Sequence, residues 1–289
     1  MYSYMSENNI GNSAILADIP HSSIARVVSL PRARPMLNAH LDDGGVVAVA
    51  KIAAIINAHR EGTIAIPSLK SYISAKDHAE RHGHDVELIC VLDRADASTV
   101  KIFNNTKFHF DHVIETSYGD LGLARNAAVQ AAKSEILAFL DADDLWSENW
   151  LTSLAAAVGQ TKGQAILHCH YNVFFGGRQE VFVHPDSDDP EFDIVGLAYQ
   201  NFWTALSGGP AEIYRKVAYE KVDWVNGFGY EDWTWNCHVL DAGFVHKRVP
   251  ETIHFIRSKR GHSLLQSLSK EGVCRMPTAT LQNIVKSQA

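Results

Sequence analysis

The sequence predicts an α/β protein in which helices flank a mainly parallel central sheet, followed by a less regular C-terminal lobe. Two observations support this fold class. Short apolar segments alternate with segments of helical spacing between Val46 and Val158, and such alternation is typical of βαβ units around a parallel sheet. After residue 163 the alternation ends, and aromatic, glycine and histidine residues recur without a regular period.

The first predicted strand, Val46–Asn57, is apolar and rich in β-branched residues, as expected for a central strand buried on both faces. The segment Ile66–His82 repeats apolar residues near helical spacing, and Pro67 suits its first turn. The elements expected next are strands at Val86–Asp93, Val113–Glu115 and Glu135–Leu140 and helices at Leu123–Ala132 and Asn149–Val158. In such sheets ligands bind beyond the carboxyl ends of the strands, which is where Asp93 and the aspartates after Leu140 are expected.

The second half is expected to add its elements to the same sheet. A strand is predicted at Ala165–Phe175, an acidic loop at Asp186–Asp193 and a helix at Trp233–Asp241. The chain is accordingly divided into an N-terminal extension (1–46), a first half (47–163), a second half (164–263) and a C-terminal tail (264–289).

Composition narrows the classes of function. The 289 residues have a formal net charge of −7, whereas a general nucleic-acid binder would normally show a basic stripe, so we expect no nucleic-acid partner. The start of the chain lacks the basic and apolar segments of a secretory signal, and the longest apolar runs fall short of the ~20 residues that cross a bilayer. We therefore expect a cytoplasmic protein, while peripheral attachment to the inner face of a membrane stays open. The cysteines show no CxxC spacing, and free thiols are expected.

An aspartate cluster, Asp141-Ala142-Asp143-Asp144, directly follows a predicted buried strand. Carboxylates crowded into one small space repel one another unless a cation or hydrogen-bond donors compensate. Oxygen ligands suit Mg²⁺ or Mn²⁺, and Mg²⁺ typically takes one or two protein carboxylates together with phosphates and water. The cluster therefore indicates a metal site. The alternative is that Asp144 or Ser147 caps the next helix.

The segment Gly119–Trp146 resembles the donor half of family 2 glycosyltransferases, which have the GT-A fold. The shared features are a glycine, the run Ala124-Arg125-Asn126, an Ala-rich helix, a strand and an aspartate-rich turn. Residues 55–61 and 91–93 resemble two upstream segments of the same family, and the resemblance extends from about residue 50 to 262. There are departures from the family pattern. His59 stands where a tyrosine is usual and Arg94 where a second aspartate is common, which leaves the nucleobase open.

The resemblance implies a nucleoside-diphosphate sugar as donor and a divalent cation, Mn²⁺ or Mg²⁺, as cofactor. It implies that Asp143 binds the metal and that a C-terminal histidine, His262 or His254, completes the metal shell. Basic residues at 257–260 would fold over the diphosphate. The donor-binding residues that it implies are Ala58, Glu61, Asp93, Arg125, Asp141 and Ala142.

The segment Asn226–Gly243 resembles the acceptor side of the same family. By that resemblance Asp232 is the general base, because an acceptor hydroxyl is a poor nucleophile until a carboxylate takes its proton. Glu231, Trp233 and a small-residue turn at Gly208 and Gly209 are implied on the acceptor side. The alternative for Glu231 and Asp232 is that they form the acidic first turn of a helix.

The expected function is that of a metal-dependent, inverting glycosyltransferase of the hexosyltransferase type, acting on a saccharide or lipid-linked acceptor in polysaccharide or glycolipid synthesis. Two alternatives remain. One is a GT-A nucleotidyltransferase, although Ala58–Thr63 lacks the Gly-rich basic loop of that class. The other is a non-catalytic nucleotide-sugar binding lobe of a larger assembly. The sequence indicates no oligomeric state.

Overall fold

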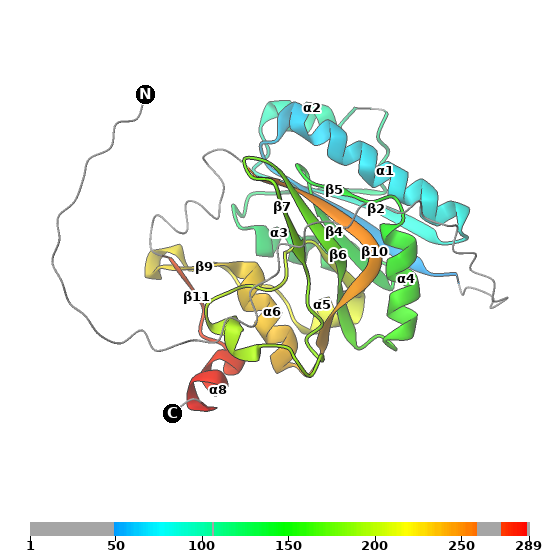
Figure 1. Cartoon of the computed structure of the whole chain (residues 1–289). Helices are drawn as coiled ribbons and strands as arrows, with labels where there is room; N and C mark the ends of the chain where they lie inside the picture. Colours follow the sequence, from blue (N-terminus) through cyan, green and yellow to red (C-terminus); the bar gives the residue numbers. More distant parts are fainter. Residues whose placement is uncertain (1–48, 106, 259–272, 288–289) are drawn as a thin grey trace, which may run out of the picture.

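The structure, a computed structural model, describes residues 49–105, 107–258 and 273–287. The predicted extension 1–46, the first residues of the predicted tail and His262 lie outside the described residues. The described residues form a nine-stranded sheet of order β3-β2-β1-β4-β8-β6-β10-β5, with β7 paired to β6 (Figure 1). A mainly parallel sheet flanked by helices, as predicted, is therefore confirmed.

The first half of the chain builds one side of the sheet. Its strands β1, β2, β3 and β4 are parallel to one another and alternate with helices. These elements are β1 (Lys51–Ala58), α1 (Ala65–Arg81), β2 (Asp85–Asp93), α2 (Ala97–Phe103), β3 (His112–Thr116), α3 (Leu121–Ala131), β4 (Ile136–Asp141), β5 (Leu145–Trp146) and α4 (Trp150–Gln160), with a short 3-10 helix, η1, at Gly62–Ile64.

The second half extends the sheet with strands of both directions. β6 and β10 are parallel to each other, whereas β8 is antiparallel to both β4 and β6. The elements are β6 (Ala165–Gly176), β7 (Glu180–Val183), η2 (Ile194–Ala198), β8 (Ser207–Pro210), α5 (Ala211–Lys216), η3 (Trp224–Asn226), β9 (Phe228–Gly229), α6 (Glu231–Asp241), β10 (Val245–Ser258), β11 (Cys274–Arg275) and α8 (Ala279–Ser287).

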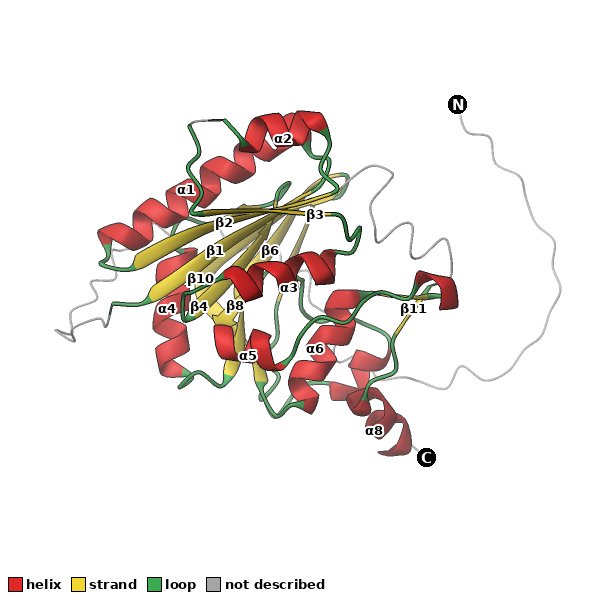
Figure 2. Cartoon of the chain, turned by 180° about the vertical axis from the view of Figure 1, so that it is seen from behind, coloured by secondary structure: helices red, strands yellow, loops and turns green. Residues whose placement is uncertain are grey.

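Helices cover both faces of the sheet. Apolar residues of α1 and α4 pack on one face, and those of α3, α5 and α6 pack on the other, which is turned to the viewer in Figure 2. Tyr72 ties α1 to two strands, because its hydroxyl donates to the Ala54 carbonyl at 2.5 Å and accepts from the Ile89 N–H at 3.1 Å. Burial of these apolar faces at roughly 25 cal/mol per Å² is the main force that holds the layers together.

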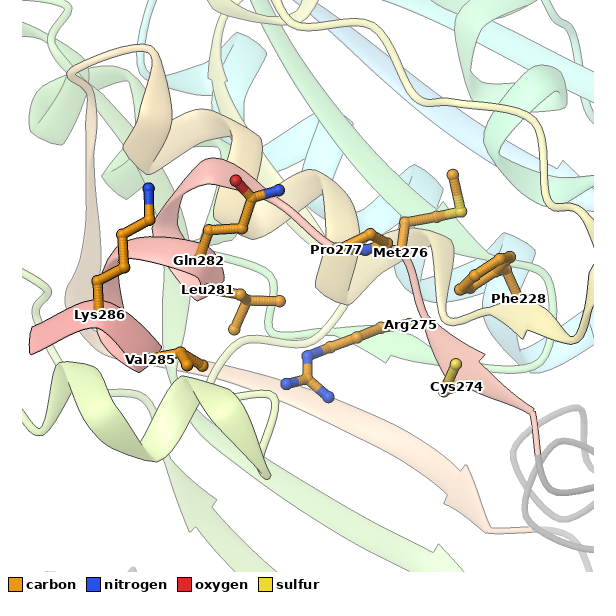
Figure 3. Close-up of a pocket in the computed structure, with 9 residues that line it drawn as sticks. All are labelled: Phe228, Cys274, Arg275, Met276, Pro277, Leu281, Gln282, Val285 and Lys286. Carbon is orange, nitrogen blue, oxygen red and sulfur yellow. The ribbon is translucent and has the colours of Figure 1, made fainter. Parts of the chain in front are cut away.

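A C-terminal segment, β11 and α8, packs against the second half of the chain. β11 pairs with β9, and Leu281 and Ile284 of α8 pack against Leu197, Trp203 and Cys237. A cavity of about 570 Å³ lies beside this segment (Figure 3), lined by Phe228, Cys274, Arg275, Met276, Pro277, Leu281, Gln282, Val285 and Lys286.

The second half of the chain buries four histidines: His168 on β6, His184 directly after β7, and His246 and His254 on β10. Nε2 of His168 lies 2.9 Å from Nδ1 of His246, and Nε2 of His246 lies 3.0 Å from the Asn236 carbonyl oxygen. Since a carbonyl only accepts, His246 carries its proton on Nε2 and accepts from His168. His168 is fully buried and packs against the rings of Trp203 and His246.

The described elements differ from the predicted ones in several places. The first described strand begins at Lys51, whereas a start at Val46 was predicted, and the elements not predicted are α2, α5, α8, β5, β7, β8, β9, β10 and β11. The four cysteines are free, and only Cys274 is exposed. Within the described residues, no helix is both long enough and apolar enough to span a membrane.

Candidate active site

The carboxyl ends of three adjacent strands place polar side chains on one face of the sheet. Ile55, Val91 and Phe139 pack against the α3 side, in the order β2, β1, β4 across the sheet. Side chains two residues apart on a strand share a face. The residues that follow at this spacing are Asp93, Asn57 and Asp141, so all three lie at the same edge on the side of α3.

Asp93 is buried and holds the loop that follows β3. Its Oδ1 accepts from the Thr116 hydroxyl at 2.9 Å, and its Oδ2 lies 3.3 Å from the Asp120 N–H. A hollow of about 440 Å³ adjoins this point and is lined by residues 115–118. Arg94 packs over Gly119, whose φ of 63° lies in the left-handed region that favours glycine.

Asn57 is the residue at this edge that sequence reasoning did not select. Only 5% of it is exposed, and neither its side-chain oxygen nor its side-chain nitrogen has a hydrogen-bond partner. Burying an amide without partners is costly. Asn57 lies directly opposite Asp141 in the sheet. Its unpartnered amide therefore points to a polar ligand or water at this edge, and the signal in the sequence was one polar residue ending an apolar run.

The aspartate cluster forms a tight turn after β4. The Ala142 N–H donates to the Asn57 carbonyl at 2.9 Å, and the Asp144 N–H donates to the Asp141 carbonyl at 3.0 Å. Asp144 Oδ1 accepts from the Arg257 N–H of β10 at 2.7 Å. The suggested capping roles are wrong, since the N-cap of α4 is Asn149 and Ser147 instead accepts from the Ile253 N–H.

The donor set around Asp143 suits a hard cation. Asp141 and Asp143 supply carboxylate oxygens, which Mg²⁺ and Mn²⁺ prefer. Within the described residues no three His, Cys, Asp or Glu side chains are gathered for a metal. His254 does not join them: it is fully buried and packs between Trp146 and Trp150.

Arg125 of α3 joins the two halves of the site. Its side chain is completely buried, Nη2 lies 3.4 Å from Asp141 Oδ1, and Nη1 lies 3.3 Å from Glu231 Oε1. The guanidinium also lies 5.5 Å from the centre of the Tyr219 ring. Arg125, implied by the resemblance as a donor-binding residue, therefore contacts an aspartate at the donor-side strand ends. Its Nε has no partner.

Glu231 and Asp232 begin α6, as the alternative interpretation of this pair predicted. Tyr230 before them has a left-handed backbone with φ of 58°, which turns the chain sharply into the helix. Such a conformation is uncommon for a residue with a Cβ and is found at functional sites. The two carboxylates are therefore held at the start of a helix, where the helix dipole favours negative charge.

Burial raises the pKa values of both carboxyl groups. The pKa of Glu231 is raised to about 7, first by burial and then by the neighbouring Asp232, and Arg125 opposes this shift. The pKa of Asp232 is also raised, again chiefly by burial, and the main opposing influence is Arg125. Perturbed carboxyl groups of this kind cluster at active sites, because a general base must titrate near the working pH.

The remaining predicted residues fall in two places. Ala58 and Ala142 are buried at the strand ends, and Glu61 Oε2 accepts from the His59 N–H at 2.6 Å. Trp233 is half-buried, and its Nε1 donates to the Leu197 carbonyl at 3.2 Å. Asp232 itself accepts from the side chain of Asn201 at 3.1 Å, a contact that the sequence did not predict.

Gly208 and Gly209 do not form a turn, and that prediction is wrong. They lie within β8, between β4 and β6. A Cβ on Gly208 would lie 2.5 Å from Leu154 and 3.0 Å from the Leu137 carbonyl oxygen. The absence of a side chain is needed there for packing against α4, and an acceptor role stays a prediction.

Comparison with known proteins extends these observations. Residues 53–222 match the family model described as Glycosyl transferase family 2. The matched segment contains the strand ends, Arg125 and the aspartate cluster, and it ends before Glu231 and Asp232. No curated protein sequence matches the chain.

Solved structures share the fold at low sequence identity. The S. aureus TarS fragment 1–349 aligns with a TM-score of 0.53 and 15% identity over 82% of this chain and 72% of that chain. The same fragment in complex with UDP-GlcNAc gives 0.52 and 14% over 82% and 65%. GalNAc-T7 with UDP, GalNAc and Mn²⁺ gives 0.53 and 14% over 73% and 44%. The chain spans only 35% of the longer TarS chain that it also matches.

Proposed function

Because the chain belongs to glycosyl transferase family 2 and is therefore a glycosyltransferase, we propose that it moves a sugar from a nucleoside-diphosphate sugar to an acceptor hydroxyl with inversion at the anomeric carbon. The buried Arg125 is the observation that supports this most. Its guanidinium contacts Asp141 at the donor-side strand ends and Glu231 beside the proposed base. One side chain thus joins the two groups of residues that such a reaction needs.

The donor is proposed to bind at the carboxyl ends of β2, β1 and β4. Asp93 and Asp141 would contact the nucleoside, and the unpartnered amide of Asn57 lies between their strands. Ala58, Glu61 and Ala142 would line the same edge. Solved TarS complexes contain UDP and UDP-GlcNAc, so a uridine diphosphate sugar is the first donor to test.

A divalent cation, Mn²⁺ or Mg²⁺, is proposed as cofactor, and the GalNAc-T7 structure contains Mn²⁺. Asp143 would hold it, and His262 stays a proposed second ligand. Such an ion, when bound, would neutralise charge on the departing diphosphate. Arg257 of β10 contacts the same turn, because its Nε donates to the Asp143 carbonyl at 3.3 Å.

Asp232 is proposed as the general base. The acceptor oxygen would form its bond to the anomeric carbon on the face opposite the diphosphate, and its proton would pass to the Asp232 carboxylate. The bond to the diphosphate oxygen would break with its electron pair. Glu231 and Trp233 are proposed beside the acceptor, which we expect to be a saccharide or a lipid-linked sugar in polysaccharide or glycolipid synthesis.

A thermal-shift screen with UDP and UDP-GlcNAc, with and without Mn²⁺, tests donor binding. A ligand at a hundred times its Kd should stabilise the protein by about 2.7 kcal/mol. UDP release from UDP-GlcNAc then tests turnover. Asp143→Ala should remove the metal dependence, and Asp232→Asn should abolish turnover while the thermal shift is retained.

Asp189→Asn in the exposed acidic loop is the matched control for Asp232→Asn and should behave as the unaltered protein. Normal turnover by Asp232→Asn would exclude this residue as the base. Binding without turnover under all conditions would favour a non-catalytic nucleotide-sugar binding lobe, and release of pyrophosphate instead of UDP would indicate a nucleotidyltransferase.

A further inference from the structure

Two asparagines connect Asp232 to the interior of the second half of the chain. Asn201, in the loop between η2 and β8, donates its Nδ2 to Asp232 Oδ2 at 3.1 Å. Its Oδ1 accepts from Nδ2 of Asn236 at 3.1 Å. Asn236 lies one helical turn after Asp232 on α6 and is 1% exposed. A continuous line of side-chain hydrogen bonds therefore runs from the carboxylate into the core.

The direction of these hydrogen bonds follows from one main-chain group. Nδ2 of Asn236 also lies 3.0 Å from the Trp203 carbonyl oxygen, which can only accept. The NH₂ group of Asn236 is therefore the donor, and the side-chain oxygen of Asn201 accepts its hydrogen bond. The Trp203 N–H also points to that oxygen, at 3.4 Å. The NH₂ group of Asn201 is consequently left to face Asp232.

The other end of this line is held by the buried histidines. The Asn236 carbonyl accepts from His246 Nε2 at 3.0 Å, and His246 Nδ1 accepts from His168 at 2.9 Å. Both histidines are fully buried, on β10 and β6. The turn of α6 that contains Asn236 is therefore anchored to the sheet.

We propose that Asn201 and Asn236 are positioning residues that hold Asp232 in its ionised, proton-accepting form. Asn201 does this by direct contact, and Asn236 acts through Asn201. The inference rests on the proposed role of Asp232 as general base, and it adds a reason why this carboxylate can remain charged where burial disfavours charge.

The charged groups around Asp232 make a neutral donor useful. Glu231 precedes it on α6, Arg125 faces it from α3, and Asp141 approaches from β4. Arg275 of β11 lies over the ring of the next residue, Trp233. Arg125 already contacts two other carboxylates. An amide donor stabilises the carboxylate without adding a further charge to this group.

The sharpest test is Asn201→Asp, which keeps the oxygen that faces Asn236 and replaces only the atom that faces Asp232. Two adjacent carboxylates then share a proton. We expect kcat for UDP release from UDP-GlcNAc to fall by up to about tenfold at pH values below the acid limb of the pH–rate profile. The acid limb of the pH–rate profile should move up by about one pH unit, so that activity recovers at higher pH. KM for the donor should be unchanged.

Asn226→Asp is the matched control, because Asn226 makes an Asn-to-Asp hydrogen bond of 2.7 Å to Asp223 on the surface. It should leave the pH profile in place. Asn201→Leu, of nearly the same size, tests the lost donor without a new charge, and its acid limb should also move upward. A loss of activity that is equal at every pH would mean that Asn201 has only a structural role, and would overturn the proposal.

A titration of the carboxyl ¹³C signals gives a readout that needs no turnover. The Asp232 signal is the one missing in Asp232→Asn, and its midpoint should rise by about one pH unit in Asn201→Leu. An unchanged midpoint would contradict the positioning role. If Asp232→Asn abolishes turnover while both Asn201 variants match their control, only this inference fails. If Asp232→Asn turns over normally, the proposed base itself fails.

Discussion

At the scale of single residues, Arg125 is the charged side chain on which the site depends. It is fully buried, and its pKa is raised, since Asp141, Tyr219 and Glu231 together outweigh the effect of burial, which alone would lower it. The family resemblance implied Arg125 as a donor-binding residue, and the structure shows its contact with Asp141. The contact with Glu231 could not be predicted, because the two residues are far apart in the chain and only the fold brings α3 against α6.

Replacing Arg125 by Met should destabilise the protein by roughly 3–5 kcal/mol, because removing one partner of a buried ion pair leaves the others unpaired. The loss should be larger at pH 8 than at pH 6. Without Arg125 the pKa of Glu231 rises above its present value of about 7, so at pH 6 this group is protonated and needs no cation. Urea unfolding at both pH values measures this.

Lys76→Met is the control for Arg125→Met, since Lys76 forms an ion pair with Glu80 near the surface. Exposed pairs contribute about 0–1 kcal/mol, so this variant should change stability little at either pH. Equal losses in the two variants would contradict the assignment of Arg125 as a buried bridging cation.

At the scale of elements, most strands and helices of the first half were predictable because they repeat apolar residues with a clear period. β8 was not, because it is four residues long and contains two glycines that resemble a turn. Its strand conformation is imposed by pairing with β4 and β6 on either side. Tertiary contacts therefore determine the conformation of a short segment whose own sequence favours no particular element. Tertiary contacts likewise bring Asn201 and Asn236 together at the site, which the sequence did not predict.

Gly208→Ala should destabilise the protein by about 1–3 kcal/mol, the usual cost of overpacking a core. The added methyl would meet Leu154 of α4 and the Leu137 carbonyl. Gly159→Ala in α4 should do the opposite and stabilise by up to about 1 kcal/mol, since nothing lies within 4 Å of its added Cβ. Unfolding midpoints of the two variants, measured together, should therefore move in opposite directions.

At the scale of the whole molecule, buried ionisable groups make stability depend on pH in two opposing ways. Burial lowers the pKa values of His168, His184, His246 and His254, with His184 at about 4 and His246 at about 3. These histidines take up protons in the unfolded chain below pH 6.5 but not in the folded one, so stability is lost as pH falls. The pKa values of Glu231 and Asp232 are raised instead, so these two groups bind protons more readily in the folded chain and increase its stability as pH falls.

Unfolding free energy should therefore fall between pH 6.5 and pH 5, because up to four histidines outnumber two carboxyl groups. Each proton changes the slope by about 1.4 kcal/mol per pH unit. His246→Gln, which keeps a donor and an acceptor, should reduce the slope by up to one proton. His109→Gln, on an exposed residue, should leave it unchanged. A slope that is the same in all three proteins would show that these histidines are not buried as described.

The pairing of Arg125 with Glu231 also has a consequence for the classification of genes. The family match covers residues 53–222, so it includes the arginine and omits the glutamate and the proposed base. Two genes with equally good matches can therefore differ in whether they encode a complete catalytic centre. A gene that matches the family can therefore be checked for both the arginine and the later acidic residue. An encoded arginine at this helix position, followed by no acidic residue at the start of the later helix, would leave the buried cation with only one of its two carboxylate partners.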